Sequence, residues 1–91
     1  MNVYSKFSQY YIEMLDEFRG LAADVREYNE SHEEIPQELK REYGRHMLIV
    51  ELLEREGKEK FNKSREELYR DGWEFWFEED AQLRKKRYGK K

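Results

Sequence analysis

The strongest constraint on the fold is the spacing of large apolar side chains in the first third of the chain. Between residues 4 and 28 these side chains recur at alternating intervals of three and four residues without a slip. Such a heptad spacing places every member on one face of an α-helix, whereas a strand would need a period of two. The pattern predicts a helix over about residues 5–30 whose buried seam consists of Tyr4, Phe7, Tyr11, Met14, Phe18, Leu21, Val25 and Tyr28.

Two further helices are predicted downstream. Pro36 suits the first turn of a helix, because its missing N–H has no intrahelical partner to lose there. The helix that it opens is expected to span residues 37–56, with Gly57 as its C-cap. Residues 64–67, Ser-Arg-Glu-Glu, match a capping box, which predicts a third helix over residues 64–87. The seam of the second helix is expected at Leu39, Tyr43, His46 or Met47, Val50 and Leu53.

The fold class that follows is all-α. Threonine is absent, valine and isoleucine are scarce, and good helix formers dominate the sequence. With 91 residues the chain makes one domain, residues 1–91, which we predict to be a three-helix antiparallel bundle with long helices. Such a short chain buries little surface and has no cysteine for disulfides, so we expect homo-oligomerisation to complete the burial.

The predicted third helix carries apolar residues on two opposite faces. At 100° per residue, Leu68 and Phe75 lie close together, nearly opposite the larger group of apolar residues. One helix of a three-helix bundle cannot easily bury both faces, so Leu68 and Phe75, with Glu79, are the predicted partner-binding surface. Alternatively, the long first helix covers this face, or one apolar residue is simply exposed. The face assigned to the core comprises Tyr69, Trp73, Trp76, Phe77, Asp80 and Leu83.

Charge is divided unevenly along the chain. Residues 1–83 hold 12 basic and 21 acidic residues, a net charge of −9, whereas residues 84–91 carry a net charge of +6. Cations near a helix C-terminus are favoured by the helix dipole, but six of them exceed what capping requires. We predict a basic C-terminal interaction tail that contacts either phosphates or the acidic body of a second copy. Its basic residues are Arg84, Lys85, Lys86, Arg87, Lys90 and Lys91.

The side chains needed for catalysis do not form a recognisable set. Cysteine and threonine are absent, and the serines fall near predicted helix starts or turns, where capping accounts for them. Glu42 and His46 are four residues apart, but no second histidine stands at ligand spacing. We therefore predict no enzyme, no metal site and no cofactor. A further candidate is a ligand pocket between the first two helices, lined by Gly20, Gly44, Arg45 and His46.

Taken together, these features predict a non-enzymatic protein-binding module that inhibits or regulates a partner protein. In size, acidity and aromatic content the chain is similar to the small accessory proteins with which phages and plasmids block host factors. Two alternatives stay open: nucleic-acid contact through the basic tail, which the acidic body disfavours, and an acidic surface that imitates nucleic acid. The sequence has neither a signal-peptide pattern nor an apolar run of membrane-spanning length, so we expect no membrane contact and a cytoplasmic location.

Overall fold

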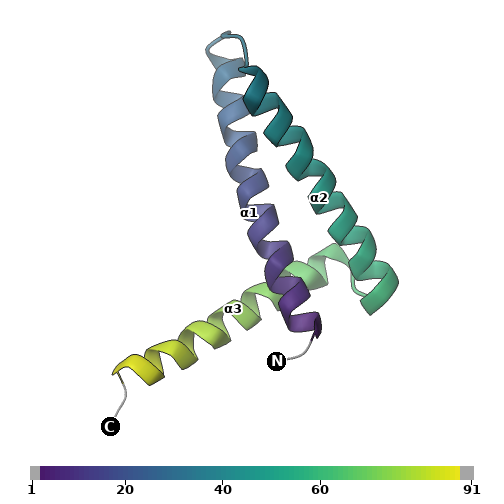
Figure 1. Ribbon diagram of the computed structural model, residues 1–91, viewed down its shortest axis with the longest axis vertical. Coiled ribbons are helices and arrows are strands. Elements are labelled where there is room, and N and C mark those ends of the chain that lie inside the picture. Colours follow the sequence, from purple (N-terminus) through teal and green to yellow (C-terminus); the bar gives the residue numbers. More distant parts are fainter. Residues whose placement is uncertain (1–2, 89–91) are drawn as a thin grey trace.

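The chain folds into three helices joined by short loops. The computed structural model describes residues 3–88, and the side chains of residues 3–82. It contains α1 (Val3–Glu30), α2 (Gln37–Phe61) and α3 (Arg65–Tyr88). Figure 1 shows α1 and α2 as an antiparallel hairpin, while α3 crosses the N-terminal half of α1 obliquely and extends away from the hairpin. Because α1 packs against both other helices, the predicted all-α three-helix bundle is confirmed for the described residues.

The core lies where the three helices meet, at one end of the hairpin. The predicted seam of α1 is confirmed, since each of its members is buried or partly buried. The far end of the hairpin is a pairing of α1 and α2 alone (Figure 1), and its apolar residues are only partly buried there. The buried apolar residues that define the core are Tyr11, Ile12, Val50, Leu53 and Leu68.

Small residues let α3 approach α1 closely at the crossing. Ser5 and Ser8 are buried inside α1, and Gly72 of α3 is buried against Ser8. A Cβ atom added to Gly72 would lie 2.6 Å from the carbonyl oxygen of Ser8 and would also overlap Ile12. The predicted capping role is therefore wrong for Ser8, whose hydroxyl donates to the Ser5 carbonyl at 3.1 Å within the helix. Ser8 thus serves as a small residue that permits the crossing.

The second helix runs beyond its predicted end. We expected it to stop at residue 56 with Gly57 as the cap, but α2 continues to Phe61. Gly57 is instead a buried helical residue, because a Cβ atom there would lie 2.6 Å from Cδ1 of Leu68. The helix ends at Asn62, whose φ of 56° is left-handed, and the Lys63 N–H then donates to the Gly57 carbonyl at 3.1 Å. Asparagine tolerates this conformation better than most residues, so it can replace glycine as the cap.

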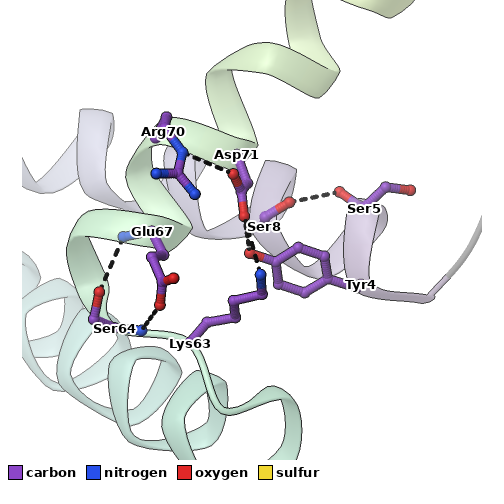
Figure 2. A network of polar contacts seen from close by, with 8 residues as sticks. All are labelled: Tyr4, Ser5, Ser8, Lys63, Ser64, Glu67, Arg70 and Asp71. Atoms are coloured by element: carbon purple, nitrogen blue, oxygen red, sulfur yellow. Dashed lines mark hydrogen bonds and ion pairs between the residues drawn. The ribbon is translucent and has the colours of Figure 1, made fainter.

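The start of α3 is the capping box that the sequence predicts. The Glu67 N–H donates to Oγ of Ser64 at 3.2 Å, and the Ser64 N–H donates to Oε1 of Glu67 at 2.9 Å (Figure 2). The bond from the Ser64 N–H lowers the pKa of the Glu67 carboxyl, so this residue is a carboxylate at neutral pH. The reciprocal pair sets the residue at which α3 begins and hence where its faces point.

Candidate interaction surface

The structure reverses the two faces that we assigned to α3. Leu68, predicted to be exposed, has an exposed fraction of 0% at the centre of the core. Phe75 is partly buried, with its ring centroid 6.1 Å from that of Tyr4 on α1. Conversely, Trp73 and Phe77, predicted to be core, are 36% and 67% exposed. The assignment is therefore wrong for Leu68, Trp73 and Phe77, whereas Trp76 packs against the core as predicted. Leu68 is closed to any partner.

The reason is that α3 crosses α1 instead of lying along it. At a steep crossing, the residue at the contact point must be small, because a large side chain would hold the two helices apart. Gly72 lies on the same side of α3 as Leu68 and Phe75, so this side faces α1. The larger aromatic residues then point away from the core. The large size of these residues predicts burial only if α3 lies alongside α1.

Three of these outward residues form a continuous surface, which we call the aromatic stripe: Tyr69, Trp73 and Phe77. They stand four residues apart along α3, one turn above another. The Trp73 and Phe77 rings stack with their centroids 5.7 Å apart, and the Tyr69 and Trp73 rings meet edge to face at 6.4 Å. The stripe is thus held in a defined arrangement by its own ring contacts.

Two hollows border the aromatic stripe. One, of about 190 Å³, lies beside Trp73 and Phe77 and is also lined by Trp76, Glu79 and Asp80. The other, of about 340 Å³, lies at the opposite end between the three helices and reaches Tyr69. Glu79, predicted to be a partner-binding residue, is partly buried at the edge of the first hollow. The stripe therefore has a recess at each end.

Arginine from α1 and carboxylates from α3 frame the aromatic stripe. The Arg19 guanidinium lies 5.3 Å from the centroid of the Tyr69 ring, which is a cation–π distance. Beyond Tyr69 the exposed neighbours are mostly acidic: Glu74, Glu78 and Asp80. The α3 helix includes residues 84–87, but the side chains of the basic tail, residues 84–91, lie outside the described part of the chain. Contacts by the tail stay a prediction.

The four residues of the predicted pocket between α1 and α2 are two glycines in open space and two side chains with polar partners. A Cβ atom at Gly20 or Gly44 would meet nothing within 4 Å, so neither glycine marks a close helix approach. Arg45 pairs with Glu42 at 3.4 Å on the surface. His46 accepts or donates a hydrogen bond at Nε2 with Oε1 of Glu17 at 2.9 Å, and its Nδ1 lies 3.1 Å from the Glu42 carbonyl oxygen. This histidine therefore bridges α2 to α1.

The His46 bridge makes stability depend on pH. The hydrogen bond to the Glu17 carboxylate, followed by the one to the Glu42 carbonyl, raises the pKa of His46 above its ordinary value of 6.5. Because the folded pKa exceeds the unfolded one, protonated His46 contributes its full stability below pH ~6.5 and loses it as pH rises through the folded pKa. We expect the difference in unfolding free energy between wild type and His46→Gln to be largest near pH ~5 and to shrink towards pH ~8.

Urea unfolding at a series of pH values measures this difference. Glutamine keeps a neutral donor at the same position, so the comparison isolates the charge on the imidazole. A difference that stays constant from acidic to weakly basic pH would contradict an ionic bridge between His46 and Glu17.

A second polar cluster fastens the start of α1 to α3 (Figure 2). The Tyr4 hydroxyl donates to Oδ2 of Asp71 at 2.6 Å, Arg70 donates to Oδ1 at 3.2 Å, and the Lys63 ammonium lies 3.8 Å from Oδ2. Burial alone would raise the pKa of Asp71, but these donors outweigh it and lower the pKa. Burial and the bond to Asp71 raise the pKa of Tyr4, so its hydroxyl keeps its proton. These bonds hold the start of α1 against α3, and they do not activate the Tyr4 hydroxyl as a nucleophile.

Neither the described side chains nor known proteins identify the chemistry of this chain. Among the described residues, no group of three or more His, Cys, Asp or Glu side chains is placed to hold a metal ion. No helix in that part of the chain is both long enough and apolar enough to cross a membrane. No protein-family model, no curated protein and no solved structure matches the chain. The aromatic stripe is therefore the feature from which a function can be argued.

Proposed function

We propose that this chain is a non-enzymatic protein-binding module that docks through the aromatic stripe of α3 and thereby inhibits or regulates its partner. The observation that carries the proposal is the exposure of three aromatic side chains that stand one helical turn apart, Tyr69, Trp73 and Phe77, on a helix that extends from the hairpin. Aromatic residues are enriched in the cores of protein interfaces and among the residues that dominate binding energy.

The arrangement of the stripe supports docking more than isolated exposure would. Single exposed apolar residues are common on protein surfaces, but a contiguous patch is unusual. The rings already contact one another, so little conformational entropy remains to be lost when a partner covers them. The adjoining hollow beside Trp73 offers a recess for an anchoring side chain, and the acidic border favours a partner with basic residues around an apolar centre.

Capture of partner proteins by stripe variants tests the proposal. We expect Trp73→Glu and Phe77→Glu to bind the captured protein at least about 30-fold more weakly than wild type, the effect of losing a residue worth about 2 kcal/mol. The full chain is immobilised, proteins are captured from a lysate of the organism that encodes it, and the affinity of the captured protein is then measured for each variant.

Leu52→Glu is the matched control, since Leu52 is 53% exposed on α2 and the substitution has the same chemistry. Wild-type affinity in this variant, combined with loss in the stripe variants, locates the binding surface on α3. Equal affinity in all variants would remove the stripe from the proposal.

A further inference from the structure

One hollow beside the aromatic stripe has a lining that combines aromatic rings with negative charge. We call it the tryptophan hollow, and it is lined by Trp73, Trp76, Phe77, Glu79 and Asp80. Both of its ionisable side chains are carboxylates, and no basic residue is among the described residues that line it. Aromatic faces and carboxylates have one property in common, since both attract cations. The ligand that fits this lining is therefore a cation.

The hollow at the other end of the stripe has no such preference. It is lined by two arginines and two glutamates, whose formal charges cancel. Arg65 pairs there with Glu66 at 3.4 Å, and the Arg19 guanidinium lies over the Tyr69 ring. A cation that entered this hollow would be repelled by both guanidinium groups. The preference for a cation is thus local to the tryptophan hollow.

The size of the tryptophan hollow suits a single side chain. Its volume of about 190 Å³ is below the ~300–1,000 Å³ of pockets that take drug-sized ligands. Trp73 and Phe77 are exposed, whereas Trp76 packs against the core and is partly buried. Because Trp73 stacks on Phe77 and Trp76 is anchored in the core, the rings need little rearrangement to receive a ligand.

We infer that the tryptophan hollow binds the guanidinium group of an arginine side chain on the partner protein. A metal ion does not suit the site, since no group of three or more His, Cys, Asp or Glu side chains is placed to hold one among the described residues. A guanidinium is planar and more weakly hydrated than an ammonium, so it stacks on a tryptophan face while its edge donates to a carboxylate. The inference rests on the proposed function, because it names what the partner inserts beside the same stripe.

Glu79 is the carboxylate that we assign to the guanidinium. Its side chain lies partly buried at the edge of the hollow, and no hydrogen bond or ion pair joins it to another described side chain. Asp80 already makes an interaction of its own, so it contributes negative charge to the site. Glu74 and Glu78 are exposed on the same helix and add to the negative potential around the hollow. A guanidinium seated against the rings thus meets a carboxylate at the rim.

Titration of the full chain with matched peptides tests the inference through its two indole N–H signals in NMR spectra. Trp73 and Trp76 are the only tryptophans of the chain and both line the hollow, so each signal reports on it. The probes are short peptides that are identical except for a central arginine, citrulline or trimethyl-lysine. We expect the arginine peptide to shift both signals with a Kd in the millimolar range, and to bind at least about fivefold more tightly than the citrulline peptide, which has the same shape without the charge. The trimethyl-lysine peptide should bind more weakly than the arginine peptide, because it has no N–H to donate to Glu79.

Two variants locate the binding in the tryptophan hollow. Glu79→Gln is expected to weaken the arginine peptide by about threefold or more and to leave the citrulline peptide unchanged, because it removes only the charge of the acceptor. Glu59→Gln is the matched control, since it removes the same charge from an exposed residue of α2. Trp73→Leu should weaken the arginine peptide by about fivefold through loss of a ring, as read from the remaining Trp76 signal. Circular dichroism of each variant verifies that the helices are retained.

The failure of this inference is distinguishable from failure of the proposed function. The guanidinium assignment would be overturned by the absence of a shift, by equal binding of the arginine and citrulline peptides, by tighter binding of trimethyl-lysine, or by equal effects of Glu79→Gln and Glu59→Gln. In each case the stripe still stands as a docking surface if Trp73→Glu and Phe77→Glu lose the captured partner. Conversely, arginine-specific shifts together with unchanged capture by these two variants would support the guanidinium site and overturn docking of that partner through the stripe.

Discussion

Leu68→Ala is expected to lower the free energy of unfolding by about 2–5 kcal/mol, the usual range for removing a buried leucine side chain. Leu68 has no exposed surface and packs directly on the backbone of Gly57, so its side chain joins α2 to α3. Alanine would leave a cavity at this junction, and the short connection between the two helices limits how far they can collapse into it. Equilibrium unfolding in urea, followed by circular dichroism, measures the loss.

Trp73→Ala is the informative comparison for Leu68→Ala. The Trp73 side chain is 36% exposed and contacts mainly its neighbours in the stripe, so we expect a loss of less than about 1 kcal/mol. Both variants must be measured where the solution mass is that of one chain, because a dimer adds stability by mass action. A larger loss for Trp73→Ala than for Leu68→Ala would contradict the orientation of α3 described above.

Local signals were sufficient to predict the helices. The heptad spacing of α1 is confirmed by the burial of its seam, and the Ser64–Glu67 pair fixes the start of α3. Such patterns involve residues within one or two turns of each other, so the sequence alone contains them. The error at the end of α2 is of a different kind, because Gly57 is used for packing against a residue of the next helix.

The orientation of α3 could not be predicted from local signals. Both of its faces carry large apolar residues, and amphipathicity therefore does not select between them. The choice depends on one long-range contact, in which Gly72 fits against Ser8 and Ile12 of α1. A small residue between Leu68 and Phe75 was the available sign of this contact. It is a weak sign by itself, since the chain has five glycines and two of them, Gly20 and Gly44, face open space.

This reversal has a direct consequence for function. The residues that appeared to be core on grounds of size, Trp73 and Phe77, are the ones available to a partner. Tyr69, Trp73 and Trp76 recur at intervals of four and three residues, and each of them keeps exposed surface although Trp76 packs against the core. Regular spacing of large apolar residues on a helix is therefore compatible with burial between molecules as well as with burial inside one.

Gly72→Ala is expected to destabilise the protein by about 1–3 kcal/mol, the range for adding a methyl group to a packed contact. Alanine is the better helix former by about 1 kcal/mol, so the steric effect must exceed this gain. The added Cβ would lie 2.6 Å from the Ser8 carbonyl oxygen, and a backbone atom inside α1 cannot move away without displacing the helix. Urea unfolding of the variant and wild type measures the change.

Gly20→Ala makes the same chemical change where no atom opposes it. Gly20 is exposed on α1 with nothing within 4 Å of the added Cβ, so we expect a gain of up to about 1 kcal/mol from helix propensity. The two substitutions should thus change the free energy of unfolding in opposite directions, which a general effect of alanine cannot produce. Stabilisation by both would mean that α3 does not cross α1 at Gly72, and it would return Leu68 and Phe75 to the surface as the residues to test for binding.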